Sequence, residues 1–297
     1  MTSQADLIYR IVAIIFPVFS IVALGYFYAR QRHDTDMSSG NRINMDIFTP
    51  ALIFDYMSGS NYALADYLNL SLGCLAIVLG SGIIAWPVAK FMGYQWKTLV
   101  PPMMFNNCGN MGLPLVALTF GEAMLPAAIL LLAISNFLHF SVGQQLITQR
   151  WTFKTVLTNP MIVATVLGIA VSILEIPLPE TLRLPIHMLG LIAIPLMLFS
   201  LGVRMIAIDF RDWKISTVGA LLCPVSGLII AVPFINLVPL PQEQASLLLL
   251  FSILPPAILN FLVAERYGQE PHQVASIVLV GNLASVLVIP ALLWFIL

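Results

Sequence analysis

Apolar residues run through this chain in long, nearly uninterrupted stretches, and they do not alternate with polar residues as in the strands of a membrane barrel. A helix needs about 20 apolar residues to cross a bilayer, and ten stretches come near that length. No connection between them is long enough for a soluble domain. We therefore predict an all-α polytopic membrane protein whose spans lie at roughly 7–30, 43–60, 67–92, 98–120, 124–149, 155–176, 184–206, 214–239, 243–267 and 272–297.

The composition agrees with this pattern. Charged residues make up 9% of the chain and hydrophobic residues 59%, whereas a soluble domain carries about 25% charged residues. A net charge of −1 gives no indication of a nucleic-acid partner. The three cysteines lie in apolar stretches without paired spacing, so we expect neither disulfides nor a metal, and no cofactor. Residues 1–6 lack the features of a signal peptide.

The distribution of basic residues predicts the orientation, because loops rich in Lys and Arg stay in the cytoplasm. Of the 13 basic residues, Arg183 and Arg10 fall on one side and 11 follow odd-numbered spans. We therefore expect both termini on the non-cytoplasmic side of the cell (inner) membrane. The 11 residues are Arg30, Arg32, Arg42, Lys90, Lys97, Arg150, Lys154, Arg204, Arg211, Lys214 and Arg266.

Two of the predicted spans contain the same motif, Pro-Pro-x-x-x-Asn. It runs from Pro101 to Asn106 in the fourth span and from Pro255 to Asn260 in the ninth, 154 positions apart (260 − 106). Paired interruptions at matching positions of two halves are the best sequence indication of a transporter's binding site. The motif therefore predicts an internal repeat.

The repeat divides the chain into two halves, residues 1–150 and 151–297, each with five spans. Since five is odd, the second half enters the membrane from the opposite side, and the repeat is inverted. Proline removes a hydrogen-bond donor and breaks the helix. The freed backbone groups persist at membrane depth only where protein or a water-filled cavity satisfies them, so two breaks predict one shared cavity.

The residues around the first break carry the chemistry expected of a binding site. Asn106, Asn107 and Asn110 offer uncharged donors and acceptors. Gly109 permits close approach of a ligand, and Pro114 suits the first turn of a restarted helix. Alternatively, this is a kinked helix whose amides bond to neighbouring helices.

The second break supplies a matching group. Pro256 and Asn260 correspond to the first break, while Asn136 and Asn282 lie on the spans that follow each break. We expect these residues to line the same cavity. Hydrogen bonding between helices, or capping of exposed backbone, is the other interpretation for each amide.

Few ionisable residues lie deep in the predicted spans. Asp55 and His139 do, and either could carry a coupling proton. The alternatives are an interfacial carboxylate for Asp55 and a hydrogen-bonded histidine of the helix bundle for His139. Since no Lys or Arg lies deep in a span, an anionic substrate would depend on helix N-termini and amide donors.

The first break resembles the auxin efflux carrier family, which includes the plant PIN-formed carriers and bacterial malate and malonate permeases. Asn107 precedes Pro114 by seven residues, as in that family, and 264–267 (Ala-Glu-Arg-Tyr) is similar to its Ala-Lys-Glu-Tyr. Gly281 followed by Pro290 resembles its last helix. Two features depart from the plant carriers. Only residues 150–154 separate the halves, as in bacterial members, where the plant carriers have a long hydrophilic loop, and Asn260 stands where the plant carriers have another residue.

This resemblance implies ten helices in two inverted five-helix repeats, with helices 4 and 9 crossing at their breaks as in sodium/bile-acid symporters and sodium/proton antiporters. It also implies a homodimer that moves organic anions by an elevator-like motion in the lipid bilayer.

We therefore expect a secondary transporter of a small organic anion, a carboxylate, that works by alternating access between the broken helices. A sodium-coupled organic-anion symporter of the bile-acid symporter type is the alternative. An intramembrane enzyme is not expected, because the four histidines are scattered and no metal-binding motif is present. A membrane sensor without transport would usually carry a soluble output domain.

Overall fold

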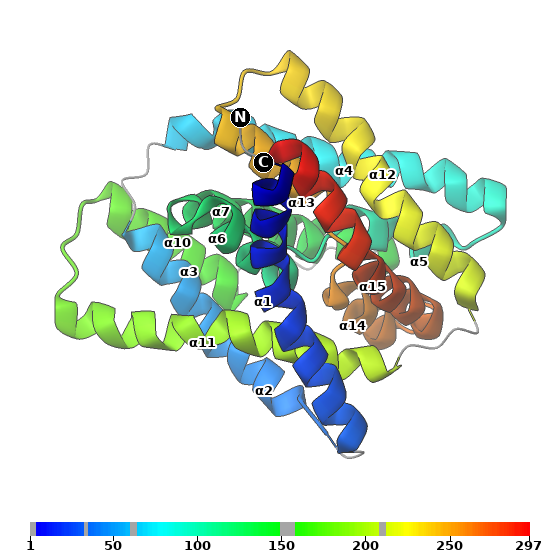
Figure 1. The fold of residues 1–297 in the computed structure, drawn as a ribbon, viewed down its shortest axis with the longest axis horizontal. Coiled ribbons are helices and arrows are strands. Elements are labelled where there is room, and N and C mark those ends of the chain that lie inside the picture. The colour runs from blue at the N-terminus through cyan, green and yellow to red at the C-terminus, as the bar shows by residue number, and fades with distance from the viewer. Residues whose placement is uncertain (1–3, 33–34, 60–63, 149–157, 208–211) are drawn as a thin grey trace.

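The structure, a computed structural model, describes residues 4–32, 35–59, 64–148, 158–207 and 212–297. Within these ranges the regular elements are helices, joined at one point by an isolated β-bridge (Figure 1). In the part of the chain that the structure describes, six helical segments are long and apolar enough to cross a membrane, and two shorter apolar helices accompany them. The six are Gln4–Gln31, Leu68–Met92, Glu122–Thr148, Glu180–Arg204, Trp213–Leu237 and Pro271–Ile296. The chain is therefore an all-helical, multi-pass membrane protein.

Helical segments lie on each of the ten predicted stretches, and several are interrupted. The first half contains α1 (Gln4–Gln31), α2 (Ser38–Ile43), η1 (Asn44–Phe48), α3 (Thr49–Ser58), η2 (Leu64–Tyr67), α4 (Leu68–Met92), α5 (Trp96–Met104), η3 (Cys108–Gly112), α6 (Leu113–Phe120), η4 (Glu122–Met124), α7 (Leu125–Leu138), η5 (His139–Gly143) and α8 (Gln144–Thr148). The second half contains α10 (Pro160–Ile173), α11 (Glu180–Arg204), η6 (Met205–Ala207), α12 (Trp213–Leu237), α13 (Gln242–Ile253), α14 (Ile258–Tyr267) and α15 (Pro271–Ile296).

The helices form two bundles. In the first bundle α1 packs on α11, and both α10 and α11 pack on α3. In the second bundle α12 packs on α4, α13 and α15, while α4 also contacts α5 and α7 (Figure 1). Each bundle draws helices from both halves of the sequence, so the fold brings together residues that are far apart in the chain.

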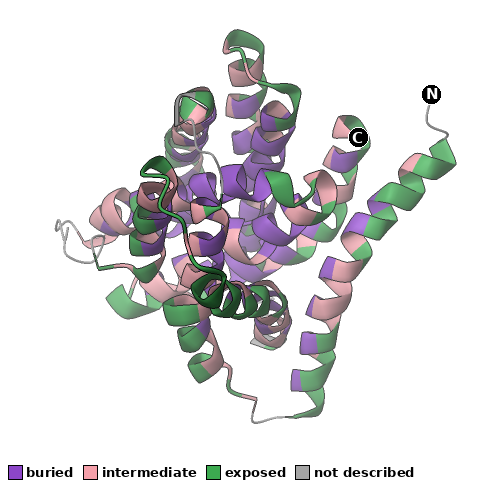
Figure 2. Cartoon of the chain, turned by 90° about the vertical axis from the view of Figure 1, so that its left-hand side faces the viewer, coloured by how far each residue is buried: buried purple, intermediate pink, exposed green. Residues whose placement is uncertain are grey.

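Burial separates the central helices from the peripheral ones. In the apolar window of α1, 22% of the residues are buried, compared with 67% in the segment that contains α7. Figure 2 shows α1 at one edge with a mostly exposed outer face, while buried residues gather in the interior. A helix that is apolar all round and still exposed fits contact with lipid, whereas α7 belongs to the protein core.

Glycines allow α1 and α11 to approach at backbone distance. A Cβ added to Gly202 of α11 would lie 1.9 Å from the carbonyl oxygen of Val22, and one added to Gly25 of α1 would lie 2.2 Å from that of Phe199. Helices in membranes associate through such small residues, since apolar side chains gain little by leaving lipid. The first bundle therefore depends on this reciprocal contact.

The two interrupted segments meet where their helices stop. Asn106 faces Pro256 in an antiparallel β-bridge. The backbone N–H of Asn107 donates to the carbonyl of Pro255 at 2.7 Å, and the N–H of Ala257 donates to that of Phe105 at 2.9 Å. Each break thus satisfies backbone groups of the other, as the hydrocarbon interior requires.

The prolines act differently in the two segments. Pro101 and Pro102 lie inside α5, and the chain leaves the helix only after Met104. Pro255 and Pro256 lie in the break itself, between α13 and α14. The missing N–H groups of Pro101 and Pro102 would have bonded to carbonyls one turn earlier. The helix α5 nevertheless continues as far as Met104 before it ends.

We expect Gly202→Ala to destabilise the fold, because its Cβ collides with a backbone carbonyl that cannot move without separating α1 from α11. Overpacking of this kind costs about 1–3 kcal/mol. Thermal unfolding of the detergent-solubilised protein, followed by tryptophan fluorescence, should show a lower midpoint. Gly40→Ala is the control, since its nearest new neighbour is a methionine methyl group 3.5 Å away. Equal midpoints for the two variants would contradict the expectation.

Candidate functional site

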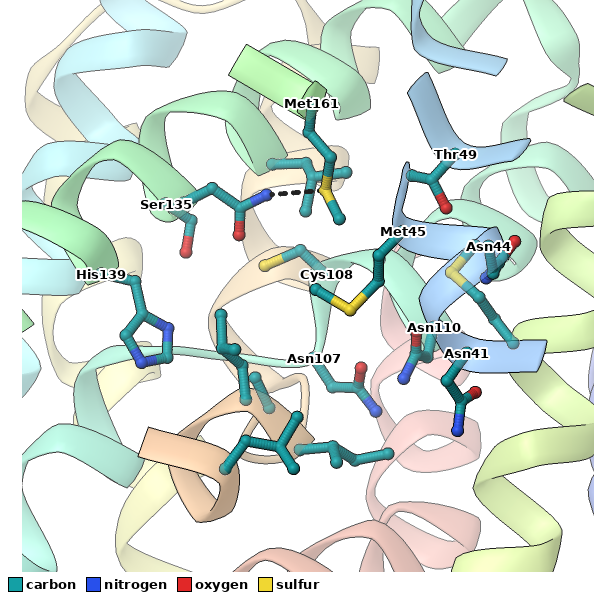
Figure 3. A pocket seen from close by; sticks show the side chains of 18 of the residues that line it. Asn41, Asn44, Met45, Thr49, Asn107, Cys108, Asn110, Ser135, His139 and Met161 are labelled. Atoms are coloured by element: carbon teal, nitrogen blue, oxygen red, sulfur yellow. Dashed lines mark hydrogen bonds between the residues drawn. The ribbon is translucent and has the colours of Figure 1, made fainter. Parts of the chain in front are cut away.

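A cavity of about 120 Å³ lies beside the crossing, between the two bundles (Figure 3). A single water needs roughly 10–15 Å³ of such space, so the cavity accommodates a solute with the bulk of several waters. Polar side chains line it on several sides. The lining residues are Asn41, Asn44, Met45, Thr49, Asn106, Asn107, Cys108, Gly109, Asn110, Leu132, Ser135, Asn136, His139, Met161, Met197, Ser200, Arg204, Ala257, Ile258, Leu259 and Leu262.

Three π-helical turns contribute to the cavity wall. They are η1, η3 and η5, and Asn44, Asn110 and His139 are among the lining residues that they supply. A π-turn inserts one residue into a helix and redirects the side chains around it, and such turns are frequent at functional sites. Their meeting at one cavity marks this region as the candidate site.

Asn106 and Asn107 touch the cavity but use their amides within the crossing. The Asn106 Nδ2 donates to the carbonyl of Phe251 at 2.9 Å. The Asn107 Nδ2 donates to Asn282 Oδ1 at 2.8 Å, and Asn282 Nδ2 donates in turn to the carbonyl of Pro256 at 3.0 Å. Three of the amides singled out in the sequence therefore connect the two breaks.

Asn260 belongs to the same network. Its Nδ2 donates to the carbonyl of Phe105 at 2.9 Å, so that this carbonyl accepts from both Asn260 and Ala257. Neither Asn260 nor Asn282 lines the cavity, although Ala257 does. These hydrogen bonds are of the kind that the alternative interpretation expects, in which the amide side chains join neighbouring helices.

Other candidate residues face the cavity more directly. Gly109, Asn110 and Asn136 all line it, and Asn136 Nδ2 lies 3.4 Å from the sulfur of Met161 (Figure 3). A Cβ added to Gly109 would have no atom closer than 3.8 Å, so open space lies in front of this backbone. Pro114 is buried in the first turn of α6 and does not line the cavity.

The two ionisable candidates lie in different places. His139 lines the cavity, is buried, and stacks on Phe105 with ring centroids 4.1 Å apart. Asp55 is not a lining residue. It pairs with His187 of α11, whose Nδ1 lies 2.7 Å from Asp55 Oδ2, and Arg183 Nε lies 3.8 Å from Asp55 Oδ1. Asp55 thus joins α3 to α11.

The structure adds lining residues from the first bundle that sequence reasoning did not single out. Asn41, Asn44 and Thr49 lie along α2, η1 and α3, and Ser200 and Arg204 lie on α11. The available signal was the spacing of three from Asn41 to Asn44 and of four from Ser200 to Arg204, which puts polar groups on one helical face. Arg204 also supplies a positive charge that the sequence analysis assigned only to a loop.

The cavity offers hydrogen-bond donors and acceptors together with a positive charge. Amides, hydroxyls, an imidazole and one guanidinium line it. Across the residues that the structure describes, no group of three or more His, Cys, Asp or Glu side chains is placed to hold a metal ion. Such neutral donors with a single positive group suit a small anion.

Comparisons with known proteins identify the family. The chain matches the family described as Membrane transport protein in two segments, residues 10–156 and 149–294. It is also 23% identical, over 97% of its length and 96% of the relative's, to a Rhizobium meliloti (strain 1021) protein named "Putative malonate transporter". These matches confirm the resemblance to the auxin efflux carriers. Because the two segments cover nearly all of its sequence, the chain belongs to the Membrane transport protein family.

Proposed function

We propose that the chain is a secondary transporter that moves a small carboxylate across the cell membrane by alternating access at the cavity beside the crossing. The observation that carries the proposal is the polar cavity itself. It lies at two reciprocal backbone breaks and between two bundles, in a multi-pass membrane protein of a transport family. Discontinuous helices of this kind form the substrate sites of secondary transporters.

The size and chemistry of the cavity favour a compact organic anion. About 120 Å³ is far below the roughly 300–1,000 Å³ typical of pockets for drug-sized ligands. Amide donors and one guanidinium provide favourable contacts for a carboxylate. The relative named for malonate supports a substrate of this size and charge.

In this proposal the ten helical stretches are ten spans in two inverted repeats, 1–150 and 151–297. The paired motifs support it, and so does the exchange of hydrogen bonds between the breaks, in which Asn106 bonds to α13 and Asn260 bonds to Phe105. In the same proposal both termini lie on the non-cytoplasmic side of the inner membrane, and the distribution of basic residues supports this orientation.

In this proposal the cavity faces the cytoplasm. Asn41 and Arg204 line it and lie next to the loops that the charge distribution assigns to the cytoplasmic side. Alternating access requires a second state in which the two bundles shift and the same residues open outward. The cavity at the junction between the bundles is where such a shift would expose it.

The proposal is tested by uptake of radiolabelled malonate into liposomes that contain the purified protein, with and without sodium. We expect uptake in both media, because amides and a guanidinium recognise the anion without a bound cation. Uptake that requires sodium would favour the symporter alternative. Empty liposomes and liposomes with heat-denatured protein are the controls. Absence of uptake and of binding for malonate and other small carboxylates would overturn the proposal.

Two asparagine variants should distinguish a residue that binds the substrate from one that stabilises the fold. We expect Asn110→Ala to reduce malonate uptake about tenfold without lowering the thermal midpoint, because Asn110 faces the cavity. We expect Asn282→Ala to lower the midpoint as well, because it leaves the Pro256 carbonyl and the Asn107 amide without their partner, at about 1–3 kcal/mol. Wild-type uptake by Asn110→Ala would remove that residue from the site.

We assign proton coupling to His139, since it lines the cavity, and not to Asp55, which lies outside it. If transport is coupled to protons, malonate uptake by the wild-type protein should carry protons into the liposomes, which a pH-sensitive dye trapped inside them reports. His139→Gln should transport without that proton movement, whereas Asp55→Asn should retain it. The reverse pattern would transfer the role to Asp55.

A further inference from the structure

Among the described residues that line the cavity, three buried polar side chains each have an oxygen atom without a hydrogen-bond partner. Asn44, Thr49 and Ser200 are 3%, 2% and 3% exposed, and all three line the cavity. Among the residues that the structure describes, no hydrogen-bond partner reaches Asn44 Oδ1, Thr49 Oγ1 or Ser200 Oγ. Asn44 and Thr49 are labelled in Figure 3, on the segment opposite His139.

Unpaired polar atoms at this depth are unfavourable. A buried hydroxyl or amide without a hydrogen bond destabilises the folded state, and native proteins retain few of them. Three on one wall of one cavity, from α11 and from the segment that runs through η1 into α3, form a cluster. Such a cluster is explained if a ligand supplies the missing partners.

A positive charge lies next to the cluster. Arg204 is four residues after Ser200 on α11, so the two side chains share a helical face. Among the lining residues that the structure describes, Arg204 is the only Lys or Arg. Glu265 of α14 acts on it electrostatically, but no ion pair between them lies within 4.0 Å in the described part of the chain.

These side chains can donate hydrogen bonds to a carboxylate and balance its negative charge. The guanidinium of Arg204 and the hydroxyls of Ser200 and Thr49 can all donate, and charge-assisted bonds of this type are the stronger ones. Asn44 can also donate if its carboxamide turns over, which exchanges its oxygen and nitrogen. Asn110, beside the first break, and Asn136 of α7 also line the cavity and remain available for another carboxylate.

We propose that Arg204, Ser200, Thr49 and Asn44 form a second anion subsite that binds the far carboxylate of a short dicarboxylate. The inference rests on the proposed function and specifies its substrate class. One carboxylate lies against the crossing in the second bundle and the other against α3 and α11 in the first. The chain therefore distinguishes a dianion from a monoanion of the same length, and the substrate spans both bundles.

The test compares two probes of nearly equal length, malonate and its monomethyl ester, which carries one carboxylate. Binding to purified protein in nanodiscs is measured by calorimetry for the wild type, Arg204→Gln, Arg204→Lys and Arg266→Gln. Arg266 is an exposed arginine of α14 that does not line the cavity, so its variant controls for loss of charge.

The wild type should bind malonate at least about tenfold more tightly than the monoester. Arg204→Gln should bind the two probes nearly equally, through loss of malonate affinity alone. Arg204→Lys should keep part of the preference, and Arg266→Gln all of it. An unchanged preference in Arg204→Gln, or an equal loss of affinity for both probes, would overturn the subsite.

Thr49→Val provides an independent check, because valine has nearly the same shape and no hydroxyl. Without ligand this variant should unfold at the same temperature as the wild type or higher, since an unpaired polar atom is removed. Its affinity for malonate should fall. An unchanged malonate affinity would show that the hydroxyl serves no anion.

These measurements distinguish an error in the second subsite from an error in the proposed function. If the wild type binds and transports malonate while Arg204→Gln and Thr49→Val behave like it, only the second subsite is wrong. If the wild type neither binds nor transports any small carboxylate, both the proposed function and the subsite are wrong.

Discussion

The hydrogen bonds that two broken helices exchange are the constraint on which the rest of the structure depends. The prolines leave backbone groups that lipid cannot satisfy. Asn107 and Ala257 donate from their backbone to the opposite break, and Asn260 and Asn282 add side-chain bonds to the carbonyls of Phe105 and Pro256. Because each break satisfies the other, non-helical backbone persists in the interior, and a cavity can form beside it.

The cavity draws its chemistry from both bundles. The second bundle contributes the breaks and the segment around His139, and the first contributes α3 and α11, which are held together by close contacts. A Cβ added to Gly190 of α11 would lie 2.9 Å from Leu52 of α3, and Asp55 bonds to His187 between the same helices. The first bundle is thus a firmly joined unit that presents Thr49, Ser200 and Arg204 as one surface.

Sequence patterns predicted the breaks better than they predicted the lining. Pro-Pro motifs inside apolar stretches have few explanations in lipid, so the breaks and the nearby Gly109 and Asn110 could be located from the order of residues in the sequence. Ser200 and Arg204 could not, because a polar residue near a span end occurs in many helices, and its importance depends on how α11 lies against the crossing. Nor could the sequence pair Asp55 with His187, since that contact joins residues 132 positions apart.

The reciprocity of the breaks also has a consequence for biosynthesis. A chain made from its N-terminus inserts the first break well before the second has been synthesised. Phe105 and Asn107 therefore lack their hydrogen-bond partners until α13 and α14 have been inserted. During that interval their backbone groups depend on water or on the insertion machinery for hydrogen bonds. The closing of the crossing is therefore a late step of assembly, and a fragment that ends before Pro255 cannot complete it.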